Sequence, residues 1–248
     1  MATNIPTNTP LQQQIDEFIA EGASWLPAGL LQDLLSPIGQ LINSGAAENA
    51  LKEGAQASDF TLPNARGNAV TLSHLLTQGP VIMTFYRGQW CPYCHLALRA
   101  YQQALPHMQA RRASLVAISP QTPHHSRAMA EKLKLTFALL SDMGNQVARQ
   151  FGLVFTIDEA VRAAHKQVCA NLPAFNGDNS WELPMGHRAA QRTPGRKGRI
   201  YRIILFHLEN VYRCSQQNCF SQQNCGRAYR DQLMLGSCEI LRNLLDRW

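Results

Sequence analysis

Two cysteines, Cys91 and Cys94, are separated by only two residues, between a buried apolar run and a segment with the pattern of a helix. A thiol at a helix N-terminus meets the positive end of the helix dipole and unpaired N–H groups, which both favour the thiolate. Two cysteines three apart on a helical turn can also close a small disulfide, so that a thiolate oxidised by a peroxide or a disulfide is resolved by its partner. The pair therefore predicts redox chemistry.

Four neighbours are predicted to support the two thiols. Pro92 fits the first turn of the expected helix, where a missing N–H costs nothing. Trp90 adjoins the pair and is expected to cover it, and Tyr93 lies between the thiols. Arg87 would add positive charge if its loop folds back toward the cysteines.

The cysteines could also serve as zinc ligands or as a haem-attachment site, but the sequence favours neither. A zinc site needs a second pair of ligands, and the later cysteines are spaced irregularly, at intervals of five, six and thirteen residues (Cys214, Cys219, Cys225 and Cys238). The string from Cys91 to His95 also matches a haem-attachment motif, but a haem would have no room between a buried strand and a helix. We therefore expect neither a metal nor an organic cofactor.

The composition is that of a globular protein. The chain has 248 residues, of which 45% are hydrophobic and 16% charged, enough for a sizeable core. No apolar run approaches the ~18 residues of a membrane span, and the first ten residues lack the pattern of a secretory leader. Together with the dilute cysteines, this predicts a protein of the reducing cytoplasm with no membrane partner.

The net charge of +6 is unevenly distributed. Residues 1–185 carry 12 Lys and Arg against 13 Asp and Glu, a net charge of −1, whereas residues 186–248 carry 11 against 4, a net charge of +7. The basic character belongs to the tail, where aromatic residues are sparse and no binding motif occurs. We therefore predict no nucleic-acid partner.

The order of apolar segments predicts three parts. Apolar residues such as Leu11 and Ile15 recur at helical spacing near the start, and from Gly54 short apolar runs alternate with helical segments. The second pattern is typical of an α/β sheet with buried central strands. The predicted parts are a helical N-terminal extension (1–50), an α/β domain (51–185) and a basic tail containing Cys and Gln (186–248).

The tail departs from this order. Arginine becomes dense after Gly186, and the string Ser-Gln-Gln-Asn-Cys occurs twice, ending at Cys219 and at Cys225. Residues 200–208 are predicted as a strand and residues 238–248 as an amphipathic helix. We interpret the tail as irregular, partly disordered, and either divergent or the product of a frame shift.

Two resemblances bear on the fold. Residues 90–94 are similar to the active-site pentapeptide of thioredoxins, and the inner tetrapeptide to the dithiol motif of glutaredoxins. Residues 54–184 resemble the alkyl hydroperoxide reductase/thiol-specific antioxidant family of peroxiredoxins. The resemblance lies in the entry strand at 54–63, in Leu72-Ser73 at the start of the first helix, and around a later strand, in Leu140-Ser141-Asp142 and 147–152. These resemblances imply a thioredoxin-like fold, with a central mixed sheet flanked by helices.

The two families assign opposite roles to the thiols. In the peroxiredoxin register Arg87 takes the place of the usual proline, Cys91 that of the usual threonine, and Cys94 that of the peroxide-attacking cysteine. In the thioredoxin register Cys91 is the exposed nucleophile and Cys94 resolves. Because Cys91 stands at the start of the helix, we favour Cys91 as the nucleophile. The family also has a cis-proline loop and a strand where this chain continues from Leu183, and residues 186–188 do not resemble that strand.

The peroxiredoxin resemblance implies a thiol-dependent peroxidase that reduces hydrogen peroxide and organic hydroperoxides. Thioredoxin or a glutathione-type reductant would restore the dithiol, and a homodimer is one expected oligomeric state. The complete Cys-x-x-Cys motif keeps a thiol–disulfide oxidoreductase of the thioredoxin type open as an alternative. A non-catalytic redox sensor or interaction protein is the third possibility, favoured if the altered ending breaks the site.

Overall fold

The computed structural model describes residues 11–25, 29–30, 33–34, 41, 49–52, 55–168, 170–185, 188–192 and 200–205. Helices and strands alternate through most of this range. In chain order they are α1 (Leu11–Trp25), β1 (Thr61–Pro63), β2 (Ala69–Thr71), α3 (Leu72–Gln78), β3 (Val81–Phe85), α4 (Pro92–Ala110), β4 (Ser114–Ser119), α5 (Pro123–Leu133), β5 (Ala138–Ser141), α6 (Gln146–Gln150), β6 (Val154–Thr156), α7 (Glu159–Gln167), α8 (Leu172–Asn176), β7 (Glu182–Pro184), β8 (Arg188–Arg192) and β9 (Ile200–Leu205).

The central sheet has five strands in the order β5-β4-β3-β8-β9. Strands β3, β4 and β5 are parallel, whereas β8 is antiparallel to both β3 and β9. Every residue of β3 is buried, as expected for a central strand covered on both faces. The predicted α/β class, with a mixed sheet between helices, is confirmed.

The two faces of the sheet carry different helices. Ile82 of β3 and Leu115 of β4 belong to the core cluster that contains α4 and α5. The alternate residues Met83 and Val116 belong to the cluster that contains Leu72 of α3 and residues of α6. This alternation follows from the two-residue repeat of a strand, and it places α4, which begins next to the cysteines, directly on the sheet.

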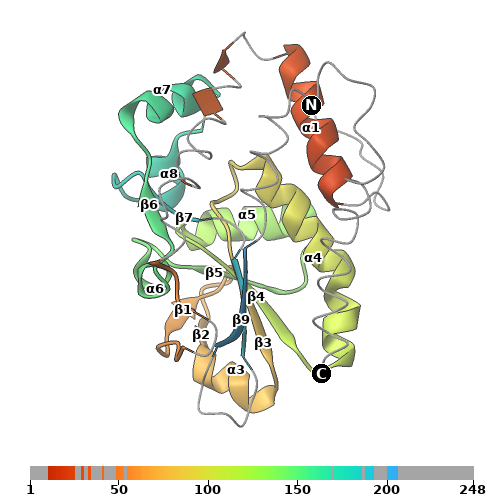
Figure 1. Ribbon diagram of the computed structural model, residues 1–248. Coiled ribbons are helices and arrows are strands. Elements are labelled where there is room, and N and C mark those ends of the chain that lie inside the picture. The colour runs from red at the N-terminus through yellow and green to blue at the C-terminus, as the bar shows by residue number, and fades with distance from the viewer. Residues whose placement is uncertain are drawn as a thin grey trace.

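Helix α1 is the longest described part of the predicted N-terminal extension. Its buried residues Leu11, Ile15 and Ile19 lie on one helical face and belong to the same core cluster as α4. Figure 1 shows α1 beside the half of α4 that begins at Pro92. Of the later part of this extension, residues 30, 33, 34 and 41 are helical, and the rest of the predicted helices lies outside the described residues. None of the helices in the described ranges is long and apolar enough to cross a membrane.

The chain after Met185 differs from the sequence-based expectation. The pattern predicts no strand directly after this residue, but β8 begins at Arg188 and pairs with β3, from Thr84 opposite Ala189 to Val81 opposite Arg192. The sequence Arg-Ala-Ala-Gln-Arg has low strand propensity, so β8 owes its conformation to the open edge of β3 rather than to local preference.

The remaining predictions for the tail have different outcomes. Strand β9 falls within the strand predicted at residues 200–208. The amphipathic helix predicted at residues 238–248 and the repeated cysteine string lie outside the described residues. The domain boundaries and the frame-shifted ending stay predictions.

Candidate active site

A short loop connects β3 to α4 and determines where the first cysteine lies. Tyr86 continues β3 by donating its N–H to Ile118 O at 2.9 Å, and the chain then turns at Gly88. Gly88 has φ of 146°, and a Cβ there would lie 2.8 Å from Nε1 of Trp90, so only glycine fits. The turn closes through a hydrogen bond of 3.2 Å from Cys91 N to Gly88 O.

Cys91 is the N-cap residue of α4, and Pro92 is in its first turn, as the sequence predicts. Its extended conformation (φ −89°, ψ 111°) lets its carbonyl accept the N–H groups of Cys94 at 3.1 Å and of His95 at 3.3 Å. The sulfur of Cys91 therefore lies at the positive end of a helix of 19 residues. Cys94 follows on the first turn and faces the core.

The sulfur of Cys91 accepts a hydrogen bond of 3.2 Å from Nη2 of Arg87. Burial raises the pKa of the Cys91 thiol, but a hydrogen bond from the Cys94 thiol and the charge of Arg87 outweigh it and bring the pKa from 9.0 to about 6. Arg87 remains charged, because the attraction of both cysteines overcomes the lowering effect of burial and raises its pKa. Cys91 is therefore the thiol of the pair that ionises first.

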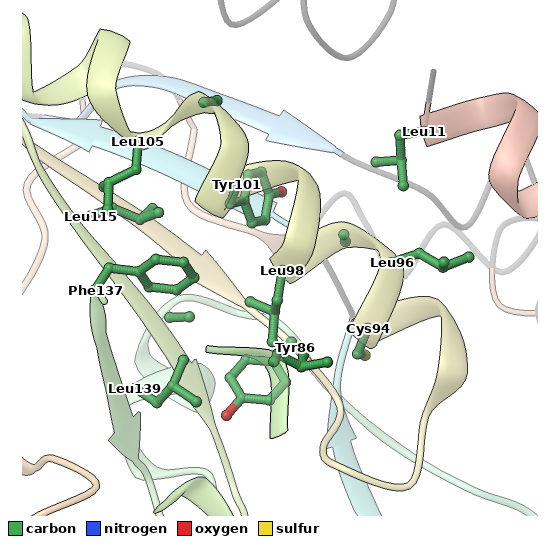
Figure 2. Close-up of a cluster of buried hydrophobic side chains, with 14 of the residues drawn as sticks. Leu11, Tyr86, Cys94, Leu96, Leu98, Tyr101, Leu105, Leu115, Phe137 and Leu139 are labelled. Atoms are coloured by element: carbon green, nitrogen blue, oxygen red, sulfur yellow. The ribbon is translucent and has the colours of Figure 1, made fainter. Parts of the chain in front are cut away.

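Cys94 has the opposite character. Burial, and then the hydrogen bond and the negative charge of Cys91, hold the pKa of its thiol well above 9.0. Cys94 is 0% exposed and shares a core cluster with Tyr86 and Leu98. In Figure 2, Leu98 extends from α4 toward Tyr86, whereas Leu96 extends toward the α1 side. Cys94 therefore stays a protonated thiol beside the thiolate.

The sequence predicts Cys91 to be an exposed nucleophile. The predicted exposure is wrong, because Cys91 is only 1% exposed. The first turn of α4 is covered in part by the N-terminal extension, where the ring of Phe18 meets Tyr93 edge-on at 5.5 Å. Trp90 packs beside the pair, with its ring centroid 5.8 Å from Cζ of Arg87. Apolar periodicity predicts the helix α1 but cannot show which surface it covers.

Three residues near the site were missed by the sequence analysis. His165 of α7 meets the Trp90 ring edge-on at 5.2 Å. Tyr86 and Gln121 are 0% exposed and joined by a hydrogen bond of 2.9 Å. One signal for the last two was present: Tyr86 directly follows β3 and Gln121 lies two residues beyond β4, and the carboxyl ends of neighbouring parallel strands meet at the same edge of a sheet.

Among the described residues, metal ligands do not gather around the cysteines. Within the described ranges, no three His, Cys, Asp or Glu side chains form a group that could hold a metal ion. The later cysteines considered for zinc lie outside the described residues. The arrangement found is a thiol of lowered pKa beside a guanidinium, with a second thiol next to it. Groups of this kind can carry out two-electron redox chemistry at sulfur.

Comparison with known proteins identifies the family. The sequence model of the AhpC/TSA family matches residues 54–168. A Mycobacterium tuberculosis protein named as a peroxiredoxin is 34% identical over 103 residues, which are 42% of this chain and 67% of that protein. The chloroplastic peroxiredoxin Q of Sedum lineare is 33% identical over 101 residues, 41% of this chain and 54% of the relative. The chain thus spans about half the length of this plant relative.

Solved structures show the same fold. Peroxidoxin BcpB of M. tuberculosis has a TM-score of 0.50 and 22% identity, covering 67% of this chain and 97% of its own. A Cys-to-Ser variant of PrxQ from Xylella fastidiosa also has a TM-score of 0.50, with 12% identity, covering 69% of this chain and 98% of its own. The fold is thioredoxin-like, and the chain belongs to the AhpC/TSA family of peroxiredoxins.

Proposed function

We propose that the protein is a thiol-dependent peroxidase that reduces hydrogen peroxide and organic hydroperoxides, with Cys91 as the attacking thiolate and Cys94 as the resolving thiol. The observation that carries the proposal is the 3.2 Å contact of Arg87 Nη2 with the sulfur of Cys91 at the start of α4. It supplies the charge that keeps a buried sulfur ionised and directs that charge at the place where a peroxide must react.

In the first step the Cys91 thiolate attacks one oxygen of the hydroperoxide. A sulfur–oxygen bond forms while the O–O bond breaks, so sulfur is oxidised to a sulfenic acid and the peroxide is reduced. The other oxygen leaves as an alkoxide, or as hydroxide when the substrate is hydrogen peroxide, and takes up a proton from solvent to give an alcohol or water. Arg87 stabilises the negative charge that passes from sulfur to the leaving oxygen.

In the second step the Cys94 sulfur attacks the sulfenic acid of Cys91. A disulfide forms and water leaves, which requires that Cys94 lose its proton as the oxidised sulfur of Cys91 loses its negative charge. Two thiol–disulfide exchanges with a dithiol protein such as thioredoxin, or with glutathione, would then restore both thiols. A reducing cytoplasm would keep such reductants available.

The peroxiredoxin register favours the reverse assignment, with Cys94 as the attacking thiol. Two facts support Cys91 instead: only Cys91 accepts a hydrogen bond from the Arg87 guanidinium, and only its pKa is lowered. Cys94 would have to ionise inside an apolar cluster and beside an existing thiolate.

A thiol–disulfide oxidoreductase is the second candidate, and the complete Cys-Pro-Tyr-Cys sequence at a helix start favours it. Exposure favours the peroxidase, because an attacked disulfide must approach the thiolate with its bulky protein attached, and Cys91 is 1% exposed. A peroxide is small enough to reach a covered sulfur with little rearrangement.

The test is to measure peroxide turnover with a thioredoxin system and reduction of the insulin disulfides by the same preparation. The proposal expects peroxide turnover to be the faster activity by a wide margin. Faster insulin reduction would replace it with the second candidate. Neither activity in folded protein would leave a redox sensor or an interaction protein.

A further inference from the structure

The loop that carries Arg87 is bound by one buried amide, that of Gln121, which lies just beyond the end of the neighbouring strand β4. Gln121, two residues beyond β4, accepts the backbone N–H of Gln89 on Oε1 at 2.7 Å. Its Nε2 donates to Oη of Tyr86 at 2.9 Å and to Oγ of Ser126 at 3.3 Å. Gln121 is 0% exposed, and these three partners occupy both ends of its amide, which fixes its orientation.

The two hydroxyl groups that bind Nε2 of Gln121 are themselves held in the core. Tyr86 directly follows β3, and burial raises the pKa of its phenol, which therefore stays neutral and accepts the amide N–H. Ser126 belongs to α5, and its hydroxyl lies 2.9 Å from that of Ser141 at the end of β5. Gln121 is thus tied to three elements of the core, and a shift of its amide would break several buried hydrogen bonds.

Gln89 lies midway in the sequence between the two residues that make the contact, two residues after Arg87 and two before Cys91. Its other backbone group is held too, because the carbonyl lies 2.6 Å from Nε2 of His95 on α4. The backbone of Gln89 is thus bound by Gln121, beyond the end of β4, on one side and by His95 of α4 on the other. The position of this peptide determines how closely the two ends of the loop approach each other.

We infer that Gln121 is a positioning residue of the active site, which holds the Gln89 peptide so that the Arg87 guanidinium stays against the sulfur of Cys91. The inference rests on the proposed function for its effect on peroxide reduction. Gln121 touches neither sulfur, so it acts only through the loop. Without it, the N–H of Gln89 would need another partner, and the loop would shift away from the Arg87–Cys91 contact.

The test measures the ionisation of Cys91 directly. Wild-type protein and Gln121→Met, which is similar in size but cannot form these hydrogen bonds, are alkylated with iodoacetamide at a series of pH values. Peptide mass spectrometry then follows the labelling of Cys91 alone. We expect the midpoint to move up by about one pH unit or more in the variant, because less of the Arg87 charge reaches the sulfur.

Ser141→Ala is the matched control, since it removes the hydrogen bond between Ser126 and Ser141 from the same buried network but no partner of Gln121. It is expected to lower the melting temperature but to leave the Cys91 midpoint in place. Equal shifts in both variants, or no shift in Gln121→Met, would overturn the inference.

Tyr86→Phe keeps the test decisive if Gln121→Met does not fold. It removes only the hydroxyl that holds Gln121 Nε2, and it should move the midpoint in the same direction by a smaller amount. An unchanged midpoint in Tyr86→Phe, with Gln121→Met unfolded, contradicts the inference. Alkylation needs no peroxide, so loss of the proposed peroxidase activity in the wild type would leave this comparison intact.

Discussion

The loop before α4 and the first turn of α4 each hold one cysteine, and the two sulfurs differ although both are buried. Cys91, on the loop side, is 1% exposed, and Cys94, on the helix side, is 0% exposed. Burial raises the pKa of both thiols, yet the pKa of Cys91 falls to about 6 whereas that of Cys94 rises. Exposure therefore does not distinguish them. The difference comes from the Arg87 guanidinium and from the single proton that the two sulfurs share.

The comparison predicts that the two thiols are not interchangeable. Cys91→Ser should lower the rate of peroxide consumption by a factor on the order of 1000 or more, because the remaining thiol, Cys94, lies in an apolar cluster that keeps it protonated. Cys94→Ser should still consume one equivalent of peroxide in a fast single turnover and then stop with thioredoxin as the reductant. Stopped-flow measurement of peroxide loss checks both. A fast single turnover in Cys91→Ser would reverse the assignment.

Removing the guanidinium should reduce the contrast between the two thiols. Arg87→Gln keeps a hydrogen-bond donor but no charge, so the pKa of Cys91 should move back toward 9.0. The rate of peroxide reduction at pH 7 should fall about 10- to 100-fold, in proportion to the lost thiolate. Arg66→Gln, at an exposed position, is the matched control and should not change the rate. An unchanged rate in Arg87→Gln would mean that another group ionises Cys91.

The pH dependence of the wild-type rate distinguishes the thiols without any substitution. A thiol with a lowered pKa is deprotonated above that pKa, so the rate of the first oxidation should rise as pH increases through about 6 and level off by pH 7 to 8. If Cys94 were the nucleophile, the rate would still be climbing above pH 9, because its pKa is raised. The second-order rate constant measured from pH 4.5 to 9.5 gives the answer.

The smallest expected effect concerns the cover over the first turn of α4. Ile15 is 0% exposed in the same cluster as Cys91 and Cys94, and Ile15→Ala should loosen the packing of α1. Alkylation of Cys91 and reduction of insulin should then increase about 3- to 10-fold through more frequent local opening, with little change in peroxide rate. Glu17→Ala, on the exposed face of α1, should leave all three unchanged. Equal alkylation in both variants would show that α1 does not limit access.

Much of the fold could be predicted from sequence, because it depends on local pattern. The continuous apolar run of β3 indicates a strand that is buried on both faces, and Pro92 after Cys91 indicates the start of a helix. The redox pair itself was recognised from residue types and spacing.

What could not be predicted depends on contacts between distant parts of the chain. Gln121 reaches Gln89 across 32 positions, and no local pattern marks a buried amide of this kind. The burial of Cys91 depends on the packing around the loop and α4. The conformation of β8 depends on the edge of β3, which a sequence of low strand propensity does not reveal.

Trapping of the sulfenic acid tests the central claim most directly. Cys91→Ser and Cys94→Ser are each treated at pH 7 with one equivalent of hydrogen peroxide in the presence of dimedone, and the adduct is located by peptide mass spectrometry. The account predicts a dimedone adduct on Cys91 in Cys94→Ser and none on Cys94 in Cys91→Ser. An adduct on Cys94 in Cys91→Ser, with Cys91 unmodified in the other variant, would contradict it.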